Sequence, residues 1–257
     1  MDESDVKAFY DDFLQSKMLD YRISGNLRID KAVERIQGYV NTDSYVLDVG
    51  CGIGISAERI AKEVEDGHVW AFDISEQNIW YARKTINESN VTFFAANVIG
   101  DQLFIQEYLT KDIDVVTLGD VIEHLPKDEH ADLFRFFRSI MSDQSYVVLT
   151  YPSPQYQRYL KIHNPSELQI IDQVIELDEL LQAARPAGFS LKRYSLETMW
   201  RRNQYVHCVL QTDSSLEKVH SEPSSLIRKV LDRSAAIWKH KVVYPFRRWK
   251  YVDSIFS

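Results

Sequence analysis

A short glycine-rich segment is the first part of this chain whose residue types and spacing indicate binding chemistry. Residues 46–54 read VLDVGCGIG, an apolar run that leads into Gly50, Gly52 and Gly54. Glycine tolerates positive φ and lets a ligand approach the backbone closely, and the N–H groups at a helix start attract polar ligand groups. We therefore predict a ligand cradle between a strand and a helix over 55–64. A tight structural turn is the alternative interpretation of the same glycines.

Two polar residues follow the next two apolar runs and extend this predicted site. Asp73 ends the run 68–73, near the spacing at which an acid meets a ribose in nucleotide-binding α/β folds. Asn97 follows the run 91–96, and its amide is suited to hydrogen bonding with an adenine edge. An ordinary acid that caps the next helix is the competing explanation for Asp73. Together with the glycine loop, these positions favour a ligand that contains a nucleoside.

A third group of polar residues indicates proton transfer. Asp120, Glu123 and His124 follow the fourth apolar run, 113–119. The imidazole of His124 titrates near neutral pH, so it is a candidate base that removes a proton from an acceptor. The alternative is that Glu123 and His124 only stabilise the loop before Pro126.

The elements that must position these residues alternate between apolar runs and segments of helical period. Strands are predicted over 45–50, 68–73, 91–96, 113–119 and 146–151. These runs are nearly continuous, which is typical of strands buried on both faces of a parallel sheet. Two later strands, 189–196 and 204–212, follow each other closely and predict an antiparallel pair at the sheet edge. We thus predict an α/β fold with a doubly wound, mostly parallel seven-stranded sheet and an antiparallel last strand.

Three further segments complete the predicted organisation. Helices over 4–21 and 27–40 form an N-terminal lid, which divides the chain into a lid of residues 1–40, a ligand-binding domain of 41–213 and an extension of 214–257. The insertion after residue 151 carries three prolines, so it is not one regular element. Such insertions often form a substrate wall, and His163 and Asp172 within it are our second choice for catalytic or acceptor contacts.

Over residues 45–212 the chain resembles the class I S-adenosylmethionine-dependent methyltransferases, in particular the small-molecule branch that includes the ubiquinone-biosynthesis O-methyltransferases. The resemblance rests on VLDVGCGIG, AFDIS, AANV and DVVTLGDVIEHLP. The stretch QIIDQVIELDELLQAARPAGF is similar to a segment of glycan- and lipid-pathway methyltransferases. Asn97 departs from the family pattern, in which an acid usually lies beside the adenine.

The resemblance implies S-adenosylmethionine as the cofactor and a role for each motif. Asp48 and Gly50 would lie under the methionine part, Asp73 would hold the ribose, and Asp120 with Val121 would face the methionine end. The full predicted cofactor set is Asp48, Gly50, Gly52, Gly54, Asp73, Ile74, Asn97, Val98, Asp120 and Val121. A nicotinamide-dependent dehydrogenase is the main rival, but its G-x-G-x-x-G spacing differs from the G-x-G-x-G of this loop.

The order Asp120, Glu123, His124 also resembles the metal cluster of the small-RNA 3′-end methyltransferases. Two carboxylates and an imidazole can hold a divalent ion. Leu125 stands where those enzymes have a further histidine. We therefore predict no metal site and keep metal dependence as the weaker alternative.

Composition limits the class of protein and its partners. The chain has 257 residues, of which 45% are hydrophobic and 26% charged, as in globular proteins. No apolar run approaches the roughly 18 residues of a membrane-spanning helix, and the acidic start is unlike a secretory signal, so we expect a cytoplasmic protein. Two cysteines are too few for a disulfide framework. A net charge of −8 disfavours nucleic acid as a partner.

The basic residues are concentrated in the extension. Residues 214–257 carry nine Lys and Arg against four Asp and Glu, mixed with several aromatic side chains. Such a composition is compatible with peripheral membrane contact. Packing back on the acidic domain, or against a second copy in a homodimer, is the interpretation we favour.

Our leading hypothesis is a methyltransferase that acts on an oxygen or nitrogen of a small-molecule acceptor, such as a sugar or a biosynthetic intermediate. The alternative from another class is a non-catalytic protein that keeps the cofactor fold for binding or assembly. An intact glycine loop and Asp73 are expected in both, so cofactor binding alone does not separate them.

Overall fold

The computed structural model describes residues 19–169 and 171–212. The first part of the predicted helix over 4–21 and the whole extension 214–257 lie outside these residues. The predicted lid, domain and extension boundaries therefore stay predictions. No helix within the described residues is long and apolar enough to cross a membrane.

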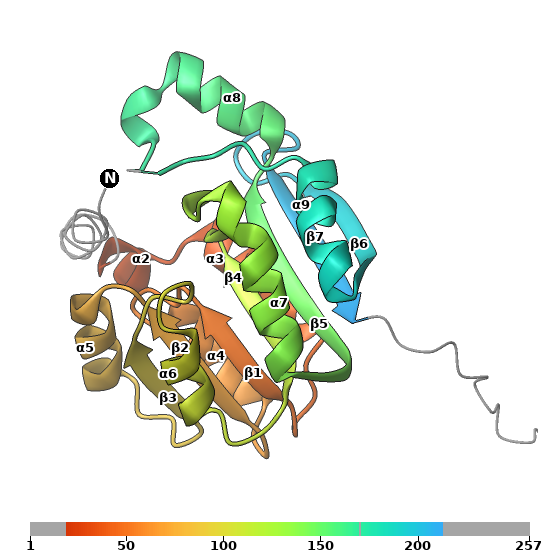
Figure 1. Ribbon diagram of the computed structural model, residues 1–257. Helices are drawn as coiled ribbons and strands as arrows, with labels where there is room; N and C mark the ends of the chain where they lie inside the picture. Colours follow the sequence, from red (N-terminus) through yellow and green to blue (C-terminus); the bar gives the residue numbers. More distant parts are fainter. Residues whose placement is uncertain (1–18, 170, 213–257) are drawn as a thin grey trace, which may run out of the picture. The chain divides into compact units, whose positions relative to one another are not determined.

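A seven-stranded sheet forms the centre of the described structure (Figure 1). Its strands are β1 (Tyr45–Val49), β2 (His68–Asp73), β3 (Val91–Ala95), β4 (Ile113–Gly119), β5 (Met141–Pro152), β6 (Phe189–Glu197) and β7 (Tyr205–Thr212), in the order β3-β2-β1-β4-β5-β7-β6. The first five pair in parallel, and β7 pairs antiparallel with both β5 and β6. The predicted fold class is confirmed. The strand order reverses between β1 and β4, and ligands bind at such switch points in open α/β sheets.

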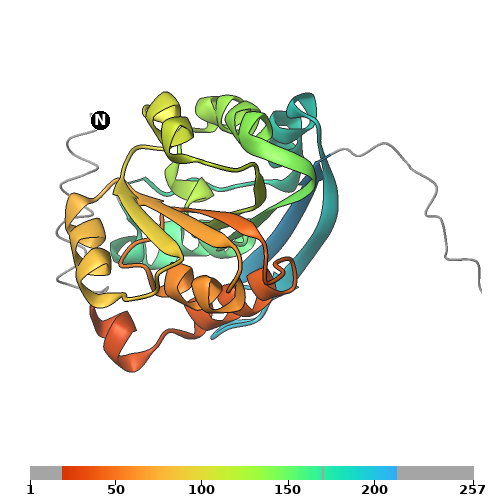
Figure 2. The same cartoon turned by 90° about the horizontal axis from the view of Figure 1, so that it is seen from below.

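Helices cover both faces of this sheet (Figure 2). They are α2 (Leu19–Ser24), α3 (Leu27–Gln37), α4 (Ile55–Glu63), α5 (Glu76–Thr85), α6 (Gln102–Tyr108), α7 (His130–Ile140), α8 (Pro154–His163) and α9 (Leu177–Ala184). Short 3₁₀ turns lie at Ile122–His124, Lys127–Glu129, Pro165–Glu167 and Arg185–Ala187. The helix α8 lies beyond the end of β5, at the top of Figure 1.

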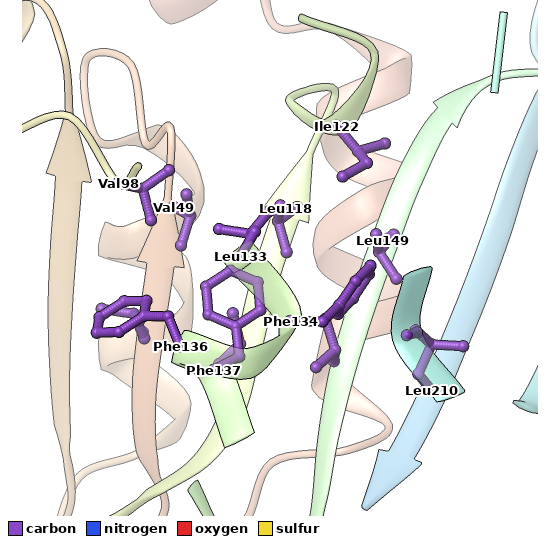
Figure 3. Close-up of a cluster of buried hydrophobic side chains, with 14 of the residues drawn as sticks. Val49, Val98, Leu118, Ile122, Leu133, Phe134, Phe136, Phe137, Leu149 and Leu210 are labelled. Atoms are coloured by element: carbon purple, nitrogen blue, oxygen red, sulfur yellow. The ribbon is translucent and has the colours of Figure 1, made fainter. Parts of the chain in front are cut away.

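Two hydrophobic clusters hold the layers together. Phe134 and Phe137 of α7 pack with Leu118 and Leu149 on one face of the sheet (Figure 3). Ile60 of α4 belongs to the cluster on the other face. Both faces of the central strands are thus covered, which explains why their sequences are nearly continuous apolar runs.

The structure adjusts several predicted element ends. The strand β5 runs from Met141 to Pro152 rather than over 146–151, and one end each of β1, β3, β6, β7 and α4 differs by one residue. The helix α2 runs past residue 21 and ends at Ser24, just before Gly25 with φ of 75°. The helix α3 ends at Gln37 rather than at residue 40, because Gly38 caps it. The order of elements that positions the site is unaffected.

Candidate active site

A cavity of about 200 Å³ lies at the carboxyl ends of β1, β2, β3 and β4, at the switch point of the sheet. Each of the four motifs that carry the family resemblance contributes residues to its lining. Of the predicted positions, it is lined by Gly50, Gly52, Asp73, Ile74, Asn97, Val98, Asp120, Val121 and His124. Tyr21, Arg28 and Ile29 from the N-terminal helices and Gln169 from the insertion also line it.

The glycine loop needs its glycines for two different reasons. Gly50, Gly52 and Gly54 all have positive φ, between 54° and 80°. A Cβ atom on Gly50 would lie 2.4 Å from Cγ2 of Val121, so this glycine lets the end of β1 approach the end of β4. A Cβ atom on Gly54 would instead lie 2.6 Å from Cδ1 of Ile86. Gly50 therefore shapes the cavity, whereas Gly54 allows the close packing of α4.

Gly54 and Asp48, both predicted to bind the cofactor, are not among the residues that line the cavity. Asp48 is buried beneath the loop, where its Oδ1 accepts a hydrogen bond from Thr117 Oγ1 at 2.6 Å. Its Oδ2 has no hydrogen-bond partner among the described residues. Burial raises the pKa of Asp48 to about 7, and the nearby Asp73 adds to the shift. The structure thus places Asp48 as a buried acid behind the binding surface.

Asp73 connects the loop to the next helix. Its Oδ2 accepts the Gly52 N–H at 2.8 Å, and its Oδ1 accepts the Ser75 N–H at 2.9 Å and Nδ2 of Asn78 at 3.1 Å. The capping role considered above belongs to Ser75, whose side chain accepts the Asn78 N–H at the start of α5. Asp73 therefore holds the glycine loop in shape as well as lining the cavity.

Asn97 lies at the end of β3 with its amide oriented by the backbone. Its Oδ1 accepts the Ile99 N–H at 3.0 Å, and its own N–H donates to Asp101 at 2.8 Å. With its oxygen engaged in this turn, Asn97 offers the NH₂ group as a donor. Val98 beside it is buried and lines the cavity.

An ion pair crosses the cavity between segments that are distant in sequence. Arg28 Nε lies 2.8 Å from Asp120 Oδ2, and Arg28 Nη1 donates to the Tyr205 hydroxyl at 3.2 Å. Asp120 has a φ of 58°, which is uncommon for a non-glycine residue. Burial alone would lower the pKa of Arg28. The neighbouring Asp120 and Tyr205 raise this pKa by more than burial lowers it, so the guanidinium stays charged. Burial raises the pKa of Asp120 while Arg28 opposes the shift.

His124 has a fixed orientation at the edge of the same cavity. Its Nδ1 lies 2.5 Å from the Ile171 carbonyl oxygen, which can only accept, so the neutral ring carries its proton on Nδ1. Burial lowers the pKa of His124, although the Ile171 carbonyl and Asp172 oppose the shift. The imidazole is therefore neutral at pH 7. The Nε2 atom lies 3.9 Å from Oε1 of Glu123, a buried residue whose pKa burial raises well above its usual range.

The two second-choice residues of the insertion differ in position. Asp172 Oδ1 lies 3.6 Å from His124 Nδ1 and accepts a hydrogen bond from Gln157 Nε2 at 2.8 Å. Asp172 is thus behind His124 rather than on the cavity surface. His163 is exposed near the end of α8, beside the Tyr159 ring at 4.7 Å, and it does not line the cavity.

Sequence reasoning missed the roles of Tyr205, of the Ile171 carbonyl and of Gln157. Tyr205 is 177 residues from Arg28, and neither spacing nor periodicity links the two positions. Gln157 is 1% exposed and lies on α8, a helix that the sequence analysis did not predict, so no pattern marked it as buried. Within residues 19–169 and 171–212, no group of three or more His, Cys, Asp or Glu side chains is arranged to hold a metal ion.

Comparisons with known proteins find similarity to methyltransferases. A ubiquinone biosynthesis O-methyltransferase of Actinobacillus pleuropneumoniae is 33% identical over 104 residues, which are 39% of this chain and 42% of that protein. The enzyme of the same name from Hydrogenovibrio crunogenus is 28% identical over 158 residues, or 57% and 62% of the two chains. The chain therefore matches less than two thirds of the length of either relative.

A solved structure has the same fold. The magnesium protoporphyrin IX methyltransferase of Synechocystis PCC 6803, with bound S-adenosylhomocysteine, superposes with a TM-score of 0.63 at 17% identity. The match covers 82% of this chain and all of that one. The profile of the methyltransferase domain family matches residues 21–194, well over half of the sequence. The chain belongs to the methyltransferase domain family, with the fold of class I S-adenosylmethionine-dependent methyltransferases.

Proposed function

We propose that this protein transfers a methyl group from S-adenosylmethionine to an oxygen or nitrogen of a small-molecule acceptor. The observation that carries the proposal is one cavity at the sheet's switch point that two groups of polar residues line. The glycine loop, Asp73 and Asn97 lie at the ends of β1, β2 and β3, and Asp120 and His124 follow β4.

The residues present fit S-adenosylmethionine in charge and shape. Arg28 is the one Lys or Arg among the described residues that line the cavity, and it suits the methionine carboxylate. Asp120 Oδ1 is buried without a partner in the described structure, and it suits the methionine ammonium. Gly50 lines the cavity with a φ of 67° and has no side chain, so a ligand can approach its backbone closely.

The remaining contacts follow from the same chemistry. Asp73 would accept hydrogen bonds from the ribose hydroxyls, and Asn97 with the Val98 backbone would meet the adenine edge. When bound, S-adenosylmethionine supplies a methyl group that its sulfonium already activates for displacement. The protein therefore has to position the acceptor, exclude water and remove a proton.

His124 is suited to the proton step. With Nδ1–H directed at the Ile171 carbonyl, Nε2 is the ring nitrogen that carries the lone pair and would take a proton from an acceptor hydroxyl or ammonium. The lowered pKa of His124 keeps the ring unprotonated at neutral pH. Tyr21, Ile29 and Leu125 provide apolar walls that limit the entry of water.

Calorimetry followed by a transfer assay tests this function. The purified protein should bind S-adenosylhomocysteine at micromolar concentration and methylate members of a small-molecule panel. Phenolic and catechol acceptors belong in that panel, because the two curated relatives are named as ubiquinone biosynthesis O-methyltransferases. Absence of cofactor binding would refute the proposal. Binding without transfer to any acceptor would favour the non-catalytic alternative.

The partner assignments for the extension also stay proposals. Residues 214–257 are proposed to contact the domain or a second copy, with anionic membrane as the competing partner. Sedimentation with anionic vesicles at low salt separates the two, since protein that stays in the supernatant has no membrane affinity. A cytoplasmic location is proposed on the sequence grounds given above.

A further inference from the structure

A second, much smaller cleft lies behind the proposed active site. It has a volume of about 10 Å³, enough for roughly one oxygen atom or water. The helix α3 forms one side of it with Arg28, Lys31 and Arg35, and the strands β5 and β7 form the other with Thr150 and His207. Arg28 lines both this cleft and the active-site cavity, so the two are neighbours.

Hydrogen-bonding groups around this cleft lack partners. Arg35 Nε and Thr150 Oγ1 are buried without a hydrogen-bond partner in the described structure, and so are both ring nitrogens of His207. His207 is 1% exposed and Thr150 is 8% exposed. An unsatisfied buried polar group costs about 1–3 kcal/mol, so three such groups around one cleft indicate a polar occupant.

The donors around the cleft favour an anion as its occupant. Three cationic side chains, Arg28, Lys31 and Arg35, line it, and each is paired with a carboxylate, Asp120, Glu34 and Glu197 respectively. Arg35 contacts Glu197 through Nη2 at 3.1 Å, so its Nε is a charged donor that lacks a partner in the described structure. Burial, and then the positive charges of Arg193 and Arg35, lower the pKa of His207 to about 4, although Glu197 opposes the shift. The imidazole is therefore neutral at pH 7 and has one N–H to donate.

We propose that the cleft between α3 and the strands β5 and β7 binds one oxyanion group, a phosphate or a carboxylate, through Arg35, Lys31, Thr150 and His207. The volume admits a single oxygen of the group. The rest of the oxyanion lies toward Lys31, whose side chain is 38% exposed at the mouth. A neutral His207 donates one ring N–H, and the Thr150 hydroxyl donates a second hydrogen bond.

Titration of the full-length protein with inorganic phosphate tests the site. Nuclear magnetic resonance at pH 7 and constant ionic strength follows the ring signals of His207. We expect a saturable shift, and in a separate pH titration phosphate should raise the pKa of His207 from about 4 to about 5. His68 serves as an internal reference, because it does not line the cleft. It lies at the start of β2, where its Nε2 is 2.8 Å from Oγ1 of Thr92 on β3. Equal shifts at His68 and His207, or no saturation, would overturn the proposal.

Substitutions locate the bound ion. Thr150→Val keeps the side-chain size and removes the hydroxyl, and should weaken phosphate binding about tenfold. Lys31→Gln should weaken it about threefold, since Lys31 is partly exposed. Lys84→Gln on α5 is the matched control, because Lys84 lies over the Trp80 ring at 4.8 Å, and it should change nothing. Unchanged phosphate affinity in Thr150→Val would mean that the ion binds elsewhere.

Phosphate binding at the cleft can be tested separately from the proposed methyltransferase function. S-adenosylhomocysteine affinity should be the same in wild type and Thr150→Val, because Thr150 does not line the larger cavity. The same titration with acetate distinguishes a carboxylate site from a phosphate site. Competition by phosphate in the transfer assay identifies an oxyanion carried by the acceptor, whereas binding without competition identifies a free ion.

Discussion

The two sides of the active-site cavity are built in different ways. On the cofactor side, the glycine loop and Asp73 come from consecutive βα units, and Asp73 bonds to Gly52 only 21 residues away. The other side, formed by Asp120, His124 and the residues that contact them, is proposed to face the acceptor and the methionine end of the cofactor. On this acceptor side, Arg28 bonds to Tyr205 across 177 residues and His124 to Ile171 across 47. The first side depends on local backbone conformation, and the second on buried charges whose partners the fold must bring together.

This difference predicts distinct failures. Changes on the cofactor side should alter loop shape and therefore cofactor affinity. On the acceptor side, a change at His124 should alter turnover, whereas a change at Arg28 should leave a buried charge without its partner and weaken binding of the methionine end of the cofactor. Four substitutions test the distinction.

His124→Gln should have the largest effect and should act on turnover alone. Loss of a positioned base lowers kcat by about 10²–10⁴-fold, while S-adenosylhomocysteine affinity stays within about twofold of wild type. His163→Gln is the matched control, because His163 is exposed outside the cavity, and its kcat should be normal. A normal kcat in His124→Gln would remove this residue from the chemistry.

The pH dependence of kcat sharpens the same prediction. A base must be unprotonated, and burial lowers the pKa of His124 below its usual 6.5. The wild-type kcat should therefore be level from pH 6.5 upward and fall as the pH drops through the lowered pKa. An activity that first declines well above pH 6.5 on acidification would contradict the assignment.

Gly50→Val should reduce cofactor affinity about 100-fold, or about 3 kcal/mol. A β-branched residue is strained at a φ of 67°, and its Cβ would lie 2.4 Å from Val121. Gly25→Ala is the control, because Gly25 also has positive φ but no atom within 4 Å of the added Cβ. Calorimetry and thermal unfolding measure both variants. Equal losses would show that backbone strain, and not the contact between β1 and β4, is decisive.

Arg28→Met should lower the free energy of unfolding by about 2 kcal/mol and also weaken cofactor binding. It leaves Asp120 without its partner at 2.8 Å, in a pair whose side chains are 22% and 13% exposed. Adding Asp120→Asn should restore part of the stability without restoring affinity. Urea unfolding of the two single variants and the double variant measures the coupling. Additive losses would contradict a direct interaction.

Asp73→Asn should have the smallest effect, about tenfold in cofactor affinity or about 1.4 kcal/mol. The amide keeps one acceptor oxygen, but its NH₂ group faces a backbone N–H that the carboxylate accepted. Asp114→Asn is a suitable control, since Asp114 accepts the Tyr45 N–H and the Ser142 hydroxyl away from the cavity. Unchanged affinity in Asp73→Asn together with Asp73→Ala would refute the ribose assignment.

The sequence was sufficient for the fold and for most of the polar residues that line the cavity at the ends of β1, β2 and β3. Strands buried on both faces appear as continuous apolar runs, so β2 and β4 were predicted at their observed bounds. The glycine loop was also predictable, because positive φ is a property of single residues. The different roles of Gly50 and Gly54 were not predictable, since they depend on which distant residue packs against each glycine, Val121 against Gly50 and Ile86 against Gly54.

The acceptor side shows what residue order leaves open. His124 was recognisable by type, but its tautomer depends on the Ile171 carbonyl, and Asp172 rather than His163 lies behind it. Local patterns report which face of an element is buried, and they contain no information about which distant element covers that face. Only the strand order, with β7 inserted beside β5, brings Tyr205 to Arg28. Because a buried charge needs a partner wherever the chain can supply one, the tertiary structure alone decided which residues meet there.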